Sequence, residues 1–240
     1  MMKYSHYARH MNIKYGKIAG SKRINELIYR CFEYISEEDE RKFIGEFRDQ
    51  PDDSDQILHT LRELVLGAYL SSSGFKVRHD CAVDSQTPDW CILDEKSGVK
   101  GIVELTNFHI DKASEDEIEA HLKARGVARV WRDKNKNNVD RLYYCIWHKA
   151  QVYGTLVEKL RVPYVVAVFG EFRAAIEFEE EVCPCLFDDE FGLFEMYPEV
   201  SGLTYFEESF GRYSFSYAHN PNALHRFDLP SGVFPPGAAD

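Results

Sequence analysis

The sequence predicts an α/β protein with a mixed β-sheet flanked by helices, preceded by an N-terminal helical extension. A helical pattern that begins near Ser54 leads directly into three short apolar strands. Farther along, a long helical stretch ends at Pro163 and precedes residues 164–169, an unbroken β-branched and apolar run. Such a run is typical of a buried central strand. A helix followed by a buried strand is half of the crossover unit that packs a helix on a sheet.

The composition is that of a globular protein. The 240 residues are 44% hydrophobic and 29% charged, with a formal net charge of −11. No apolar run is long enough to span a membrane, and the basic, polar first residues do not form a secretory signal. The six cysteines are scattered, and Cys183-Pro184-Cys185 lacks the spacing of a zinc knuckle. We therefore expect a cytoplasmic protein with reduced thiols and no membrane partner.

The N-terminal extension is expected to cover residues 1–55, ahead of a core at 56–240. Its first 20 residues look irregular. Apolar residues at helical spacing then predict one helix over residues 23–35, and a second short helix is expected over 37–47. The Pro- and Asp-rich stretch that follows breaks the chain before the core begins.

The core opens with an amphipathic helix. Ser54 or Asp55 can cap its first turn, and Gly74 marks its end. Its apolar residues form a broad face, and Glu63 lies off the main apolar stripe. Three strands are expected next, at residues 75–79, 90–93 and 101–105. The last two are joined by a turn at Lys96-Ser97-Gly98, so they form a hairpin.

The rest of the core mixes helices and strands. A helix at 115–124 is expected, then a basic segment, then the long helix over Val139–Leu160. After the buried strand at 164–169, the alternating pattern predicts two more strands. These are at residues 202–206 and 213–217. The Pro-rich residues 230–236 are expected to form a coil tail.

Three acids stand in order along the helix and hairpin. Glu63 is on the helix, Asp89 begins one strand, and Glu104 sits inside the next strand after two apolar residues. A carboxylate within an apolar strand is costly unless it is paired, protonated or bound to a metal. The three together suit Mg²⁺ or Mn²⁺, which take oxygen ligands. His79 and His109 are close in sequence, but such a site does not require imidazole, so we expect neither to be a ligand.

The pattern resembles the PD-(D/E)XK nuclease superfamily, the restriction-endonuclease-like fold. Pro88-Asp89 matches the first half of that motif, and Glu104 begins the second half. Glu63 falls where many members carry a helix glutamate, and the likeness covers roughly residues 56–170. The resemblance implies metal-dependent hydrolysis of phosphodiester bonds in nucleic acid, with all three acids around a Mg²⁺ or Mn²⁺ ion.

The sequence departs from the motif at Thr106, which stands where the family has a lysine that activates or positions the attacking water. Some members are similar in carrying this lysine on a neighbouring element. Lys149 on the long helix is the best candidate here, and Lys112 is a weaker one. Gln151 and Tyr153 on the same helix are expected to contact the substrate backbone.

A local basic segment on an acidic chain supplies the expected contacts to nucleic acid. Its candidate residues are Arg129, Arg132, Lys134 and Lys136. Such a run is equally compatible with a solvated loop. The resemblance favours DNA over RNA as the substrate. Because cutting both strands usually needs two active sites, it also makes a homodimer plausible.

Two other classes of function were weighed against the nuclease. The first is a catalytically inactive nuclease-like fold that serves as a protein- or nucleic-acid-binding module. The second is a different enzyme, but the chain has no P-loop, no G-x-G-x-x-G and no G-x-S-x-G elbow. Cys145 and His148 lie one turn apart on the long helix, and a thiol protease needs further groups. We therefore predict a nuclease, with the inactive module as the alternative.

Overall fold

The protein belongs to the α/β class. The computed structural model describes residues 22–49, 54–84, 86–108, 120, 124, 135–170, 176–188, 190–209 and 211–235. Within these residues the strands form a mixed seven-stranded sheet in the order β1-β2-β3-β4-β5-β6-β7. None of the helices in this part of the chain combines the length and apolar character needed to cross a membrane.

The chain divides into two compact units. The first unit comprises Met1–Val103, Ser209–Ser214 and Gly232–Asp240. The second comprises Glu104–Glu208 and Phe215–Ser231.

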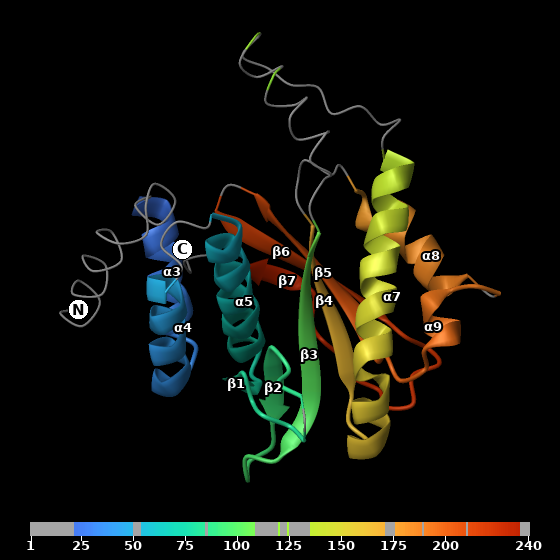
Figure 1. The fold of residues 1–240 in the computed structure, drawn as a ribbon, viewed down its shortest axis with the longest axis horizontal. Helices are drawn as coiled ribbons and strands as arrows, with labels where there is room; N and C mark the ends of the chain where they lie inside the picture. The colour runs from blue at the N-terminus through green and yellow to red at the C-terminus, as the bar shows by residue number, and fades with distance from the viewer. Residues whose placement is uncertain are drawn as a thin grey trace. The chain divides into compact units, whose positions relative to one another are not determined.

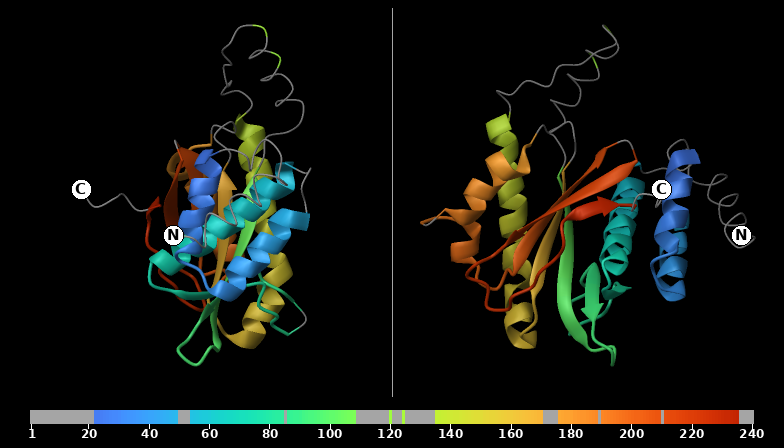
Figure 2. Two further views of the ribbon diagram at one scale, coloured as in Figure 1. Left: turned by 90° about the vertical axis from the view of Figure 1, so that its left-hand side faces the viewer. Right: turned by 180° about the vertical axis from the view of Figure 1, so that it is seen from behind.

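Three helices open the first unit: α3 (Lys22–Phe32), α4 (Glu37–Asp49) and α5 (Ser54–Ser72). Both α3 and α4 pack against α5, as the two views of Figure 2 show in blue and teal. Ser36 caps α4, because its Oγ accepts a hydrogen bond of 3.1 Å from the backbone N–H of Asp39. The two helices expected ahead of the core are therefore confirmed.

The middle of α5 is buried on all sides. Every residue from Thr60 to Leu70 is buried, Glu63 included, so the helix has no solvated face there. Gly67 lies against the indole of Trp90, and a Cβ at this position would overlap the ring. Glu63, which lies off the main apolar stripe in the sequence, is buried all the same, because the packing around α5 covers more than one stripe.

The three expected strands of the core follow α5: β1 (Lys76–His79), β2 (Trp90–Leu93) and β3 (Val99–Phe108). β1 pairs with β2, and β2 with β3, both antiparallel. The predicted turn is present: the N–H of Asp94 donates to the carbonyl of Gly98 at 2.9 Å. Ser97 adopts a φ of 66°, and the N–H of Gly98 donates to Asp94 Oδ1 at 2.7 Å.

The second unit is built around the long helix and the buried strand. Helix α7 (Asn135–Leu160) packs on β4 (Tyr164–Gly170), as Figure 1 shows in yellow and gold. All seven residues of β4 are buried, as the apolar run predicts. β4 pairs in parallel with β5 (Gly202–Ser209), and the unit contains most of β6 (Arg212–His219). Three short helical segments lie between β4 and β5: η3 (Phe178–Val182), α8 (Cys183–Phe187) and α9 (Leu193–Met196).

The end of the chain differs from the prediction. Residues 232–234 form a strand, β7 (Gly232–Phe234), where a coil tail was expected. Phe234 is fully buried, and its ring contacts Tyr34 edge-on at 5.5 Å between centroids. A three-residue strand between prolines is too short to leave a periodic pattern in the sequence. The expected irregular residues 1–20 lie outside the described part of the chain, as does the helix over 115–124 apart from residues 120 and 124.

Candidate functional site

The second unit pairs a buried acid with a lysine. Glu104 of β3 is 1% exposed, and the side chain of Lys149 on α7 is 28% exposed. Lys149 Nζ donates a hydrogen bond of 2.8 Å to Glu104 Oε2. A charge-assisted bond of this length compensates much of the cost of burying a carboxylate. The contact joins the two residues that the sequence put forward as ligand and water-activating lysine.

Two tyrosines hold α7 in the position from which Lys149 reaches Glu104. The hydroxyl of Tyr164 on β4 donates to the carbonyl of Lys149 at 3.0 Å. The ring of Tyr153 lies 5.6 Å from that of Tyr164, between centroids. Because both contacts lie within one turn of Lys149, the lysine side chain extends from a fixed backbone.

Asp89 lies at the entrance to β2. It is half-buried and follows the buried Pro88, and its carbonyl accepts a hydrogen bond of 3.2 Å from the N–H of Asp80. Trp90, the next residue, is opposite Val103 in the antiparallel pairing of β2 with β3. Asp89 immediately precedes Trp90 in the chain, and Glu104 immediately follows Val103.

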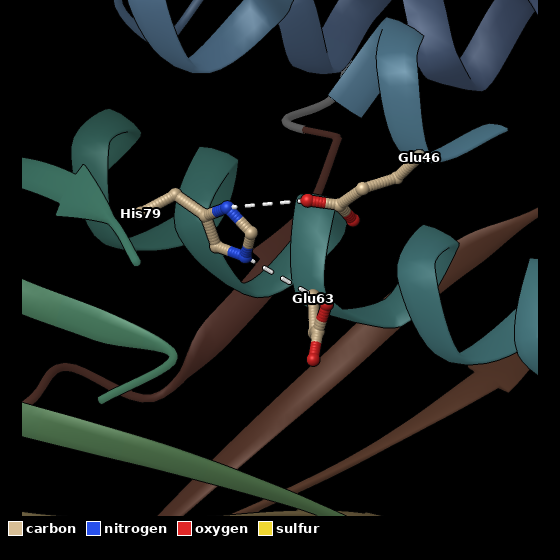
Figure 3. Close-up of side chains that lie close together, drawn as sticks. All are labelled: Glu46, Glu63 and His79. Carbon is tan, nitrogen blue, oxygen red and sulfur yellow. Dashed lines mark ion pairs between the residues drawn. The ribbon is translucent and has the colours of Figure 1, made fainter. Parts of the chain in front are cut away.

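Glu63 lies in the first unit with two histidines and a second glutamate. Its Oε1 is 2.9 Å from Nε2 of His59, one turn earlier on α5. Its Oε2 is 3.7 Å from Nε2 of His79, the last residue of β1. On the other side of the imidazole ring, Nδ1 is 3.7 Å from Oε1 of Glu46 on α4 (Figure 3). We call Glu46, Glu63 and His79 the Glu–His cluster.

The charges of the Glu–His cluster are coupled. Burial alone would raise the pKa of Glu63, but its interactions with the imidazoles of His59 and His79 outweigh burial and lower the pKa to about 2. Burial raises the pKa of Glu46 to about 7, although the charge of His79 acts in the other direction and lowers it. Burial would lower the pKa of His79, but its interactions with the carboxylates of Glu63, Asp80 and Glu46 raise it. The cluster thus holds an ionised Glu63 beside an imidazole that binds protons readily.

The position of His79 is set by groups on α4 and β2. The backbone N–H of His79 donates a hydrogen bond of 3.1 Å to Asp39 Oδ1, and its backbone carbonyl accepts one of 2.7 Å from Lys42 Nζ. The ring stacks obliquely on Phe43 at 4.3 Å and contacts Trp90 at 5.1 Å, between centroids. His79 is consequently 2% exposed and is held on both its backbone and its side chain.

Strand geometry separates the Glu–His cluster from Asp89. His79 is opposite Trp90 in the β1–β2 pairing, so their side chains share a face. Trp90 Nε1 donates to the carbonyl of Glu63 at 2.9 Å, which ties this face to α5. Because successive side chains of a strand point to opposite faces, we expect Asp89 to point away from the cluster. The structure thus joins Glu63 to His79 and Glu46 instead.

The predicted substrate-binding residues have different environments. Gln151 on α7 is exposed, whereas Tyr153 is buried and packs in the core of the second unit. Thr106, at the position of the motif lysine, is half-buried. The other predictions lie outside the described residues: Lys112, His109, Arg129, Arg132, Lys134 and the side chain of Lys136.

Two members of the Glu–His cluster were not among the expected ligands: Glu46 carried no prediction, and His79 was expected not to be a ligand. Glu46 follows the apolar residues Phe43 and Ile44 and precedes Phe47 on α4, all three of them buried. The position of an acid among apolar residues could have identified Glu46, just as it identified Glu104. His79 ends an alternating strand, and only the packing of α4 on β1 reveals its carboxylate neighbours.

The sequence and the structure were compared with known proteins. No family model matches the chain, and neither curated proteins nor solved structures gave a match.

Proposed function

We propose that the protein is a metal-dependent nuclease that hydrolyses phosphodiester bonds in nucleic acid. The observation that carries the proposal is the ion pair between the buried Glu104 and the partly exposed Lys149. A lysine beside a metal-binding carboxylate can orient or activate the attacking water and stabilise the charge that builds on the phosphate. Lys149 supplies from α7 the positive charge that Thr106 cannot supply from β3.

Asp89 and Glu104 are the proposed ligands of a Mg²⁺ or Mn²⁺ ion. They flank one residue pair of the β2–β3 hairpin. Mg²⁺ is commonly held by one or two carboxylates, with water and substrate phosphate completing its shell. Glu63, the third acid of the sequence prediction, is not needed in this ligand set, and its neighbours in the first unit suggest a different role.

The order of elements supports a restriction-endonuclease-like fold. Helix α5, the strands β1, β2 and β3, helix α7 and strand β4 follow one another along the chain. This is the helix–strand–strand–strand–helix–strand order of the PD-(D/E)XK core that the sequence resembles. Fold-level likeness supports an activity only by analogy, so the functional argument rests on Glu104 and Lys149.

The proposed substrate is DNA in preference to RNA, and the proposed location is the cytoplasm. All six cysteines are free thiols, which is consistent with a reducing compartment. The basic residues between 123 and 141 would contact phosphates, on a chain whose net charge of −11 otherwise repels nucleic acid. Cleavage of both strands would be accomplished by a homodimer with two active sites.

Calorimetric titration with Mg²⁺ tests the proposed ligands without any assumption about the substrate. The full chain should bind Mg²⁺ at millimolar concentration or below, and Asp89→Ala should abolish this binding. Asp84→Ala is the matched control, because Asp84 is exposed in the loop before β2. If the wild type does not bind Mg²⁺, the proposed catalysis fails and the inactive binding module becomes the better account.

A further inference from the structure

The Glu–His cluster brings three potential metal ligands together from three elements. One ligand atom each from Glu46, Glu63 and His79 lies within 4.8 Å of the other two. They come from α4, α5 and β1. Figure 3 shows the two carboxylates approaching the imidazole from the two helices. Such convergence of residues far apart in sequence is the arrangement that a bound ion requires.

Hydrogen bonding does not account for the convergence. The distances from His79 to Glu46 and to Glu63 are both 3.7 Å, longer than a hydrogen bond. His79 Nδ1 is buried and has no hydrogen-bond partner among the described residues. It faces Glu46 Oε1 and, at 3.5 Å, Asp80 Oδ2. A buried polar nitrogen without a partner is costly, and a metal ion is one means of satisfying it.

The spacing suits a small cation after a modest movement inward. Ligand atoms about 2.1 Å from a shared ion lie roughly 3 to 3.5 Å from one another. An ion binds only one of the two ring nitrogens of His79, so the relevant spacing is that of one atom from each residue, which reaches up to 4.8 Å, and the carboxylates must move inward by about 1 Å or more. The side chain of Glu46 is 28% exposed, so it can move and leaves a path for the ion. His59, bonded to Glu63 at 2.9 Å, would orient that carboxylate as groups behind metal ligands commonly do.

The donor set selects the class of metal. One imidazole nitrogen and two carboxylates favour first-row transition ions over Mg²⁺ and Ca²⁺, which prefer oxygen alone. Mn²⁺ stands at the weak end of the affinity order that the divalent first-row ions generally follow at such a site.

From these observations we infer that Glu46, Glu63 and His79 bind a divalent transition ion, with Zn²⁺ bound more tightly than Mn²⁺. The ion links α4, α5 and β1 and so stabilises the first unit. The inference does not depend on the proposed nuclease activity, because it uses neither Asp89 nor Glu104.

The test is calorimetric titration of the metal-free full chain with Zn²⁺. A Cys183→Ser/Cys185→Ser background prevents binding by the C-x-C thiols. We expect saturable binding of Zn²⁺ at a high-affinity site, and an affinity of that site at least tenfold lower in Glu46→Gln. Glu46→Gln is preferred to a change at His79, because the partly exposed Glu46 tolerates substitution more readily. Circular dichroism verifies that the variant is folded.

Three controls give the result its meaning. Glu38→Gln changes an exposed acid of the same helix and should leave Zn²⁺ affinity unchanged. Glu104→Gln should also leave it unchanged, which separates this site from the proposed nuclease ligands. With Co²⁺ as the probe, the protein should show d–d absorption without a thiolate charge-transfer band. Absence of saturable Zn²⁺ binding, equal losses in Glu46→Gln and Glu38→Gln, or a thiolate band would each overturn the inference.

Discussion

At the scale of single residues, the pairing of Glu104 with Lys149 makes the sharpest prediction. Lys149→Met keeps much of the side-chain volume but leaves the carboxylate of Glu104 buried without its 2.8 Å partner. The free energy of unfolding should fall by about 1–3 kcal/mol. Cleavage of nucleic acid should be lost at the same time, because the water loses its positively charged neighbour.

Urea unfolding and a nuclease assay on the same preparation check this prediction. Lys100→Met is the matched control, since Lys100 is an exposed lysine of β3. Lys100→Met should change neither the free energy of unfolding nor the nuclease activity appreciably. Full activity in Lys149→Met would remove Lys149 from the mechanism even if the protein were less stable.

The low pKa of Glu63 predicts a stability loss in acid. Its folded-state pKa of about 2 lies below the ordinary value of 4.5, so its ionised form stabilises the fold above that value. This contribution is lost as the pH falls from about 4.5 toward about 2. In the presence of a chelator, it should amount to about 2 kcal/mol between about pH 5 and about pH 3.

Urea unfolding of the wild type and of Glu63→Gln at the two pH values measures the contribution. The variant should show a smaller loss over this interval, and Glu38→Gln should behave like the wild type. Identical pH dependence in wild type and Glu63→Gln would mean that His59 and His79 do not hold the carboxylate ionised.

The sequence could identify Glu104 and Lys149 because each carries a local signal. An acid in an apolar strand and a lysine on a helix adjoining that strand are visible in the order of residues. Glu46 and His79 depend on how α4 packs on β1, through the bonds of Asp39 and Lys42 to the backbone of His79. That packing joins residues about 40 positions apart, and no spacing rule encodes it.

At the scale of elements, the fit of α5 against β2 predicts a strong effect at Gly67. Gly67→Ala places a methyl group where the Trp90 indole lies, so the ring or the helix must shift. The expected cost is about 1–3 kcal/mol of folding free energy. Thermal and urea unfolding measure it.

Gly45→Ala in α4 is the matched control, because a methyl group there meets nothing within 4 Å. Alanine at this interior helix position should stabilise the protein by roughly 0.5–1 kcal/mol. Destabilisation by Gly67→Ala together with stabilisation by Gly45→Ala would support the packing of Trp90 on α5. Stabilisation at both would contradict it.

Elements with long, clear patterns were predictable, and short ones were not. The amphipathic residues of α5 and the apolar run of β4 were recognised at nearly their full length. α7 begins at Asn135, ahead of the expected Val139, because its first residues are polar and carry no apolar period. β7 depends on tertiary contacts such as that of Phe234 with Tyr34, which a local pattern does not contain.

At the scale of the whole molecule, the uneven charge predicts how nucleic acid would bind. The net charge of −11 repels nucleic acid, whereas the positive charges of the basic segment attract its phosphates locally. Changing Arg129, Arg132 and Lys134 together to alanine should weaken DNA binding. The slope of the logarithm of the binding constant against the logarithm of the salt concentration should also become shallower, by the amount expected for about three phosphate contacts. Fluorescence anisotropy at several salt concentrations measures both.

The matched control changes three exposed basic residues outside this segment: Arg41, Lys76 and Arg161. Their replacement alters the net charge equally and should have a smaller effect on DNA binding. Equal effects of the two triple variants would assign binding to overall charge and not to the basic segment.

The proposed metal-dependent nuclease activity requires Glu104. The most direct measurement is the cleavage of single- and double-stranded DNA with Mg²⁺ or Mn²⁺, comparing the wild type with a folded Glu104→Gln variant. The account predicts cleavage by the wild type that a chelator abolishes, and at least a hundredfold slower cleavage by the variant. Metal-dependent cleavage that survives in Glu104→Gln, or none by the wild type on either DNA or RNA, would contradict it.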